Sequence, residues 1–348
     1  MQQTPTIELI LENIKPILAL GFFGFATAML LTPIYTKFAF NYKWWKKQRV
    51  DTVSGEKAVV FHKLHAEKHK RHIPTMAGIV CILSITIVTV LFNLDRNQTW
   101  LPLATLLLFG VFGLLDDLSN VFLKSDKRGG LSPKTQILAL AALSAVGSWW
   151  FYYKLGYDAI LIPWYGSVGI GVLYIPLFIA IVVSTSKAVS ITDGLDGLAG
   201  GLLSIAFSAY AVICLLQGNF LLAAFCCTLV GVMLAYTWFN IYPARFFMGQ
   251  TGSTALGAVL GVIAMLTNTV ALLPLIGIIF AIEAGSSLIQ VVSKKLFKRK
   301  LFLSAPIHHH LEASGWPETK VTMRFWVLGQ VAAVLGLLLA ALGGFLKI

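Results

Sequence analysis

Long apolar runs, repeated along most of the chain, are the feature that most restricts how this sequence can fold. Ten runs of membrane-spanning length, or nearly so, fall at about 17–40, 73–94, 100–115, 135–153, 168–186, 200–216, 221–239, 253–270, 271–292 and 326–346. A helix needs about 20 apolar residues to cross the hydrocarbon core of a bilayer. Hydrophobic residues make up 57% of the 348 residues and charged residues only 12%, unlike the balance of a soluble domain. The sequence therefore predicts an all-α integral membrane protein, with ten transmembrane helices in one domain over 1–348.

Two of these runs are short, and another contains residues that break helices. The runs at 100–115 and 200–216 span a bilayer only if they are tilted or if their polar ends lie in a protein-lined cavity. Pro274, Gly277 and Gly285 fall in the ninth run. We therefore expect an interruption in that span.

The distribution of basic residues predicts the orientation of the chain. With ten spans, one set of loops holds 23 of the 27 Lys and Arg residues, and the other holds only Lys15, Arg96, Lys154 and Lys347. Because cytoplasmic loops are enriched in Lys and Arg, this places the first set in the cytoplasm and both termini outside. On the outer side, the stretch 156–166 is expected to form a small surface hairpin.

Every stretch with unusual polar chemistry falls on the predicted cytoplasmic side. The stretches are 70–78, 116–134, 190–201, 240–253 and 306–318. Polar and ionisable groups at a membrane are costly and usually functional. Five loops that converge on one face therefore indicate an active site.

The stretch from Ser190 to Gly201 is the most unusual of the five. It places the carboxylates of Asp193 and Asp196 among four glycines, with long apolar segments on both sides. Glycine lets the backbone approach a ligand closely, and carboxylates suit a metal-bound phosphate or a nucleotide. The alternative is a turn that carries two solvated acids.

Asp116 and Asp117 stand next to each other at the end of the third run. Adjacent carboxylates repel, so one of them is expected to bind a cation or to take up a proton. The alternative is an acidic helix end that faces water.

A glycine-rich stretch and a run of histidines complete the set. Gly249 and Gly252 precede an apolar helix, whose first backbone amides favour an anion such as phosphate. The three histidines 308–310 cannot share one helical face, but histidine can donate to phosphate. The alternatives are a simple glycine-rich turn and a solvated basic loop. Together with the acids, these groups suit phosphoryl transfer with a divalent metal, which needs mainly positioning and charge stabilisation.

Several stretches resemble those of the phospho-N-acetylmuramoyl-pentapeptide-transferases, a branch of the polyprenyl-phosphate N-acetylhexosamine-1-phosphate transferases. The resemblance covers the chain from about residue 20 to its end. The matching stretches are Pro74-Thr75-Met76, Asp116-Asp117, Thr192-Asp193-Gly194-Leu195-Asp196-Gly197-Leu198-Ala199, Asn240, Phe247-Met248-Gly249, Gln290, Pro306-Ile307-His308-His309-His310-Leu311-Glu312, Gly315-Trp316-Pro317-Glu318 and Arg324-Phe325-Trp326.

The resemblance implies a fold, a reaction and a location. It implies ten transmembrane helices around a cytoplasm-facing active-site cleft, in a homodimer in the bacterial inner membrane. The implied reaction transfers phospho-MurNAc-pentapeptide from UDP-MurNAc-pentapeptide to undecaprenyl phosphate, with Mg²⁺. Its products are UMP and lipid I, an intermediate of peptidoglycan synthesis. Membrane lipid is then the environment, and no nucleic acid partner is expected.

The resemblance also implies site residues, carried over by position. The implied catalytic residues are Asp116, Asp117, Asp193 and His309. The implied substrate-binding residues are Lys70, Thr75, Ser190, Asp196, Asn240, Phe247, Gln290, His308 and His310. The implied metal ligands are Asp117 and, weakly, Gln250.

The sequence departs from the family pattern at several of these positions. Gln250 stands where the family usually has an aspartate that binds magnesium, and an amide coordinates without charge, so metal affinity is expected to fall. Lys187 and Ser190 stand where the family has asparagines. Alternatives are a sister enzyme with another N-acetylhexosamine donor, a homologue that binds these ligands without efficient catalysis, and, more distantly, a transporter or channel.

Overall fold

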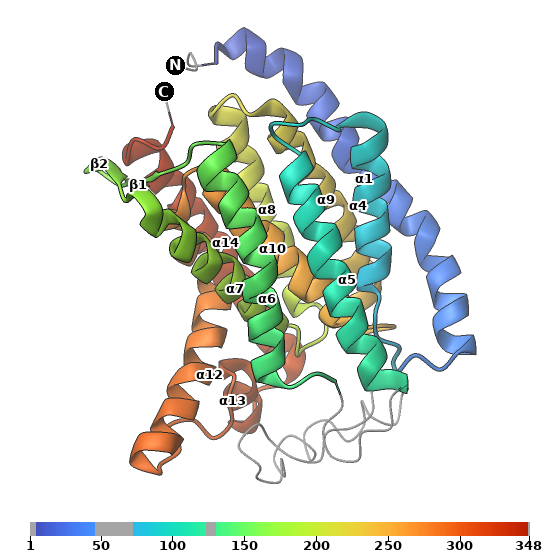
Figure 1. The fold of residues 1–348 in the computed structure, drawn as a ribbon. Helices are drawn as coiled ribbons and strands as arrows, with labels where there is room; N and C mark the ends of the chain where they lie inside the picture. Colours follow the sequence, from blue (N-terminus) through green and yellow to red (C-terminus); the bar gives the residue numbers. More distant parts are fainter. Residues whose placement is uncertain (1–4, 46–71, 123–129, 347–348) are drawn as a thin grey trace.

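The computed structural model describes residues 5–45, 72–122 and 130–346 as a bundle of helices (Figure 1). The helices are α1 (Ile7–Asn41), α4 (Gly78–Phe92), α5 (Trp100–Phe122), α6 (Pro133–Trp149), α7 (Tyr174–Thr192), α8 (Leu198–Leu216), α9 (Phe220–Asn240), α10 (Gly249–Leu266), α11 (Leu273–Ile276), α12 (Ile278–Phe297), α13 (Ile307–Ala313) and α14 (Glu318–Leu342). Single turns of other helix types lie at Trp150–Lys154, Gly171–Leu173 and Val270–Leu272. Two short strands, β1 (Ala159–Ile162) and β2 (Gly166–Gly169), pair antiparallel. The predicted hairpin is therefore present, a few residues beyond its expected start.

Each expected apolar run coincides with a helix or, for the ninth run, with the bent pair α11 and α12. Within the described residues, seven helices are long and apolar enough to cross a membrane, or eight if the bent pair is one span. Helices α4 and α6 are shorter, with 15 and 17 residues. The prediction of a helical, multi-pass membrane protein is thus confirmed, and the count of ten spans stays a prediction.

The outer helices carry their apolar side chains outward, the reverse of a soluble protein. Leu18 and Leu30 on α1, and Val327 and Leu338 on α14, are all more than half exposed. Polar and small side chains lie inside instead, and nearly all of the residues of α10 are buried. A surface of this kind is stable only where lipid replaces water, as the hydropathy of the sequence predicts.

Helix α10 occupies the middle of the bundle and packs against α5 and α7 (Figure 1). Small residues allow this packing, because they let helix backbones approach closely. On α5, a Cβ added to Gly113 would overlap the carbonyl oxygen of Gln250 on α10. Gly113 thus sets the distance between two helices that both carry candidate site residues.

Gly113→Ala is expected to lower the free energy of unfolding by about 2 kcal/mol, because the added methyl forces α5 and α10 apart. Thermal unfolding of the detergent-solubilised protein measures this change. Gly285→Ala on α12 is the matched control, since a Cβ there meets nothing within 4 Å. An equal effect of the two substitutions would show that close packing at Gly113 is not required.

Local sequence explains where several helices begin, bend and end. Ser132 caps α6 by accepting a hydrogen bond from the amide of Thr135, with Pro133 at the first helical position. At Gly277 the chain turns by 83° between α11 and α12, so the predicted interruption of the ninth run is present. Helix α5 continues through the acid pair to Phe122, whereas the apolar pattern predicted an end at the acids. The helix continues because both carboxylates are buried and accept hydrogen bonds there.

The two termini and the β1–β2 hairpin lie at one end of the bundle, and α13 lies at the other (Figure 1). The described parts of the five polar stretches lie toward the α13 end, at or near the ends of helices. This arrangement leaves the candidate site residues together at one end of the protein.

Candidate active site

Two stretches far apart in the sequence run side by side at the start of α10. The amide of Phe247 donates to the carbonyl of Pro74 (2.8 Å), and the amides of Ala77 and Gly78 donate to the carbonyls of Phe247 and Met248 (3.0 Å each). Phe247 itself is half-buried. This short ladder joins the Pro-Thr-Met stretch to the Phe-Met-Gly stretch, so both lie next to the acid pair of α5.

The first turn of α10 holds the carboxylate of Asp117. The backbone amide and the hydroxyl of Thr251 both donate to Asp117 Oδ2, at 2.9 and 2.8 Å. A helix N-terminus favours negative charge, because its amides lack carbonyl partners and its dipole is positive. The anion that the start of α10 receives in the structure is thus a carboxylate of the protein.

Gly249 makes room for this carboxylate. Its φ of +74° suits glycine, and a Cβ at this position would overlap Asp117 Oδ2 and lie 2.8 Å from the Thr75 hydroxyl. Thr75 is buried, and its carbonyl accepts a hydrogen bond from Tyr35. Asp117 and Thr75 therefore flank the same backbone turn.

Asp116 faces a different part of the bundle from its neighbour. Its Oδ1 accepts a hydrogen bond from the amide of Leu131 (2.6 Å), and its Oδ2 accepts one from Gln136 Nε2 (2.9 Å). Successive side chains on a helix are separated by about 100°. The pair therefore diverges: Asp117 turns toward α10, and Asp116 turns toward α6.

The Asp-Gly stretch lies between α7 and α8, close to these acids. Asp193 ends α7 and is half-buried. Ser190, in the last turn of α7, donates to Gln250 Oε1 on α10 (2.7 Å), and the next residue of α10, Thr251, donates to Asp117. The end of α7 that Asp193 follows therefore contacts the same start of α10 as Asp117.

Asp196 and Asn240 hold this stretch in place through the backbone. Asp196 Oδ2 accepts from the amide of Ala244 (3.0 Å), and its own amide donates to Glu318 Oε1 (2.6 Å). Asn240 accepts from the amide of Gly197 (3.0 Å) and donates to the carbonyl of Phe246 (2.8 Å). Both side chains are buried. In the structure they position neighbouring backbone.

Gln250 is already engaged by hydroxyl groups. Its Oε1 accepts from Ser190 on α7 (2.7 Å) and from Thr254 on α10 (3.2 Å). An amide oxygen with two hydrogen bonds is a poorer metal ligand than a carboxylate, since it carries no net charge and must give up a partner to coordinate. The structure therefore brings Ser190, a predicted substrate-binding residue, into direct contact with Gln250, a predicted weak metal ligand.

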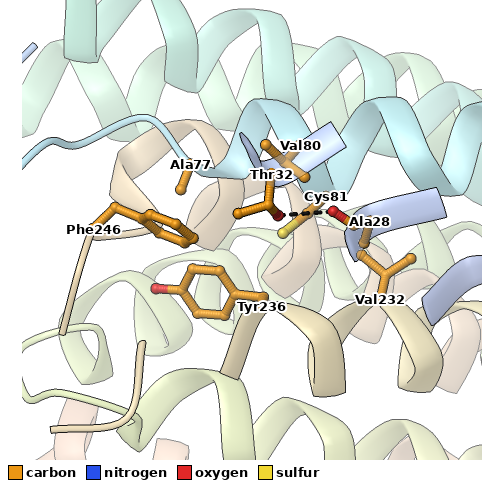
Figure 2. A pocket seen from close by; sticks show the side chains of 8 residues that line it. All are labelled: Ala28, Thr32, Ala77, Val80, Cys81, Val232, Tyr236 and Phe246. Carbon is orange, nitrogen blue, oxygen red and sulfur yellow. Dashed lines mark hydrogen bonds between the residues drawn. The ribbon is translucent and has the colours of Figure 1, made fainter. Parts of the chain in front are cut away.

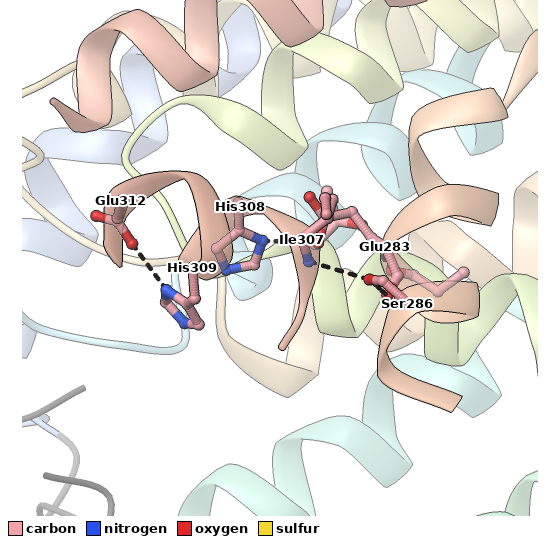
Figure 3. Close-up of polar contacts among 8 residues, drawn as sticks. Glu283, Ser286, Ile307, His308, His309 and Glu312 are labelled. Atoms are coloured by element: carbon pink, nitrogen blue, oxygen red, sulfur yellow. Dashed lines mark hydrogen bonds and ion pairs between the residues drawn. The ribbon is translucent and has the colours of Figure 1, made fainter. Parts of the chain in front are cut away.

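The three histidines lie on a short helix, α13, and take different partners; Figure 3 shows His308 and His309. His308 Nδ1 lies 2.7 Å from Glu283 Oε2, and His309 Nδ1 lies 2.8 Å from Glu312 Oε2. His310 Nδ1 accepts a hydrogen bond from the amide of Leu303 (3.2 Å). The expectation that the histidines do not share one face is confirmed.

His308 also connects α13 to the Asp-Gly stretch. The ring is 1% exposed, and its Nε2 would lie 2.6 Å from a Cβ added to Gly194. Glu283, which faces its other nitrogen, is completely buried in α12. The sequence analysis missed Glu283, although an acid inside an apolar run is itself a signal of function.

Two other predicted residues lie apart from the acids or outside the described chain. Gln290 accepts from the amides of Leu301 and Phe302 (3.0 and 3.1 Å) and donates to the carbonyl of Phe302 (2.9 Å), so it closes the turn after α12. Lys70 lies outside the described residues. Gln136, which contacts Asp116, was also missed, because a lone glutamine in a helix gives no pattern.

A small apolar hollow lies beside the Pro-Thr-Met stretch (Figure 2). It is too narrow to hold a water molecule and is lined by Ala28, Thr32, Ala77, Val80, Cys81, Val232, Tyr236 and Phe246. None of these side chains is charged, and the Thr32 hydroxyl donates to the carbonyl of Ala28 within its own helix (2.7 Å). The hollow therefore offers nothing to hold a phosphate.

The donor set fits only a metal ion that shares its ligands with a substrate. Among residues 5–45, 72–122 and 130–346, no three His, Cys, Asp or Glu side chains cluster as a metal site would require. Asp117 supplies a carboxylate, and Gln250 supplies an uncharged oxygen. Mg²⁺ is commonly held by one or two carboxylates together with substrate phosphates and water.

Comparison with known proteins finds relatives that share one name. Residues 99–268 match the family described as glycosyl transferase family 4. The phospho-N-acetylmuramoyl-pentapeptide-transferase of Chloroflexus aurantiacus is 37% identical over 96% of this chain and 92% of its own length. The protein of the same name from Chloroflexus aggregans is 41% identical over 78% of this chain and 78% of its own length. The one from a Geobacillus species is 36% identical over 90% of this chain and 94% of its own length.

Proposed function

Because the chain belongs to the phospho-N-acetylmuramoyl-pentapeptide-transferase family, we propose that it transfers phospho-MurNAc-pentapeptide from UDP-MurNAc-pentapeptide to undecaprenyl phosphate. Lipid I and UMP are the products, and lipid I serves peptidoglycan synthesis. The observation that carries the proposal is the shared turn at Gly249, where the Asp117 carboxylate and the Thr75 hydroxyl meet at the start of α10. That turn joins three of the sequence stretches that resemble the family.

The proposed step is a phosphoryl transfer at the phosphorus that carries the sugar. An oxygen of the lipid phosphate attacks this phosphorus, the bond to the bridging oxygen breaks, and UMP leaves with that oxygen. Asp117 takes the proton of the lipid phosphate, and the Thr75 hydroxyl donates to a phosphate oxygen. Such reactions depend mainly on positioning and on stabilisation of charge.

We propose the remaining predicted residues as the surroundings of this step. Asp193 faces the nucleotide, since it follows the end of α7 that contacts the start of α10 through Ser190 and Gln250. His309, next to His308 on α13, is oriented by Glu312 and lies near the diphosphate. Asp196 and Asn240 hold the backbone of the nucleotide pocket rather than the nucleotide itself.

We propose that the metal is Mg²⁺ and that the protein holds it weakly. Asp117 is its carboxylate ligand, and Gln250 contributes at most a neutral oxygen. When bound, the ion neutralises phosphate charge. Most of its remaining ligands come from the donor diphosphate and water.

Gln250→Asp is expected to lower the Mg²⁺ concentration for half-maximal transfer by about tenfold, because it adds a charged ligand beside Asp117. A Mg²⁺ titration of transfer measures this, and Mn²⁺ binding followed by electron paramagnetic resonance measures it without substrate. Gln250→Ala is the control and should not strengthen binding. No difference between the Asp and Ala variants would mean that another group binds the metal.

The proposed orientation places the site end of the bundle in the cytoplasm of a bacterial inner membrane. Loops at that end carry most of the basic residues in the sequence, and both termini lie at the other end (Figure 1). We propose ten spans, with α4 and α6 as the short ones, and a homodimer. Protease or thiol-labelling access from each side tests the orientation, and light scattering tests the dimer.

A direct assay tests the proposed function. Purified protein is mixed with radiolabelled UDP-MurNAc-pentapeptide and undecaprenyl phosphate, and the release of UMP and the formation of labelled lipid are followed. UDP-N-acetylglucosamine in place of the donor tests the sister activity. Absence of UMP release with every divalent metal would contradict the proposal.

A second candidate follows from Gln250 and its two hydroxyl partners. A homologue that binds the nucleotide sugar and the lipid phosphate but turns them over poorly would carry an uncharged residue in this position. Nucleotide binding by calorimetry, together with the absence of UMP release, would favour this candidate.

A further inference from the structure

Lys187 is a cation near the end of the membrane-spanning helix α7, on the side of the candidate site. It lies on α7, is half-buried, and its Nζ donates to Gln136 Oε1 on α6 (2.5 Å). A charged side chain within a span is expensive and is usually kept for a function. This contact links Lys187 to a neutral amide that itself contacts the site.

Gln136 stands between this cation and an acid. Its Oε1 faces the ammonium of Lys187, and its Nε2 donates to Asp116 Oδ2 (2.9 Å) and to the carbonyl of Leu131 (3.3 Å). If the amide flipped, its oxygen would face the carboxylate and its NH₂ group would face the ammonium. Both contacts would be repulsive, so Lys187 fixes the orientation in which Gln136 donates to Asp116.

Asp116 is thereby held away from Asp117. Besides the bond from Gln136, its other oxygen accepts the amide of Leu131 at 2.6 Å, and the side chain is 3% exposed. Asp117 meanwhile receives both donors of Thr251 on the opposite side of α5. A chain of hydrogen bonds from Lys187 through Gln136 to Asp116 thus connects α7, α6 and α5.

We propose that Lys187 is a positioning residue for the transfer reaction, which acts on Asp116 through Gln136 and so keeps the Asp116 carboxylate turned toward α6 and away from that of Asp117. The inference rests on the proposed function, because the kinetic experiments below measure the rate of that transfer. The competing view is that Lys187 contacts a substrate phosphate directly. The two views differ in which kinetic constant changes and in whether the effects of Lys187 and Gln136 add.

The first experiment compares Lys187→Met with the wild type. Loss of the cation is expected to lower kcat by about 20-fold, as removal of a residue that orients a site group commonly does. The KM for the donor should stay within about threefold, since ground-state contacts are unchanged. Lys187→Arg should recover most of kcat, and Lys15→Met, an equal charge change on exposed α1 surface, should change neither constant.

The second experiment is a double-mutant cycle. Gln136→Leu interrupts the connection, so the pair Lys187→Met and Gln136→Leu should be no slower than Gln136→Leu alone. Additive effects, or a large rise in donor KM with kcat unchanged, would overturn the proposal in favour of direct substrate contact. Unchanged kinetics in Lys187→Met would overturn it as well.

A third measurement does not depend on turnover. Because the Leu131 amide donates to Asp116, hydrogen exchange of the segment 130–136 should accelerate by about tenfold in Lys187→Met and not in Lys15→Met. If the wild type transfers no donor, the proposed function fails, and this measurement still tests the connection. Unchanged exchange in Lys187→Met would overturn the connection even if the wild type is active.

Discussion

Asp117→Asn is expected to lower the rate of transfer by about a thousand-fold, within the range found for general acid–base groups. The change keeps the size of the side chain and both acceptor positions for Thr251, but it removes the negative charge and the ability to take a proton. The start of α10, which favours an anion, would then face a neutral amide. UMP release by purified protein at saturating substrates measures the loss.

The control for this prediction is an identical substitution at the other end of the bundle. Asp95 accepts hydrogen bonds from the amides of Asn97 and Gln98 at 2.8 Å each, and an asparagine can do the same. Asp95→Asn should therefore keep wild-type activity. If Asp117→Asn retained more than about a tenth of wild-type activity, Asp117 would not be the group that takes the proton.

Glu283→Ala is expected to destabilise the protein by about 3 kcal/mol, because it removes one member of a fully buried hydrogen-bonded pair. His308 would be left with its Nδ1 facing a cavity, at 1% exposure and without access to water. The same change would release α13 from α12 and move the ring that packs on Gly194. Tryptophan fluorescence during thermal unfolding measures the stability, and UMP release measures the effect on the site.

Glu283→Gln separates the charge from the hydrogen bond. The glutamine keeps an acceptor for His308 Nδ1 and the volume of the side chain, so its loss of stability should be much smaller than that of Glu283→Ala. The pair of substitutions Glu283→Ala and His308→Ala should cost less than the sum of the two singles. A fully additive result would contradict an energetically coupled pair.

The helices and their broad arrangement could be predicted from the sequence because hydrophobicity governs both. Each apolar run of spanning length corresponds to a helix or a bent pair, and Gly277 marks the bend as expected. The five polar stretches gather at one end because backbone and charged groups cannot remain in hydrocarbon. These are properties of segments, which composition and spacing record well.

The partners of individual side chains could not be predicted, because they depend on how each helix is rotated and packed. The sequence places Asp116 beside Asp117 but does not say that one contacts α6 and the other α10. Asn240 was predicted to bind substrate, and only the fold shows that its amide contacts the backbone of Gly197 and Phe246. Glu283 lay inside an apolar run, and only the fold brings His308 to it.

Because Asp116 and Asp117 point in different directions, their contacts depend on the rotation of α5 about its own axis. Insertion of one residue before Asp116 would rotate both carboxylates by about 100°, so that Asp116 would point toward Thr251 and Asp117 would point toward neither of the present partners. Substitutions along the lipid-facing side of α5 leave this angle unchanged, whereas a change of length does not. The spacing from Gly113, which fixes α5 against α10, to the acids is therefore as much a part of the site as the carboxylates themselves.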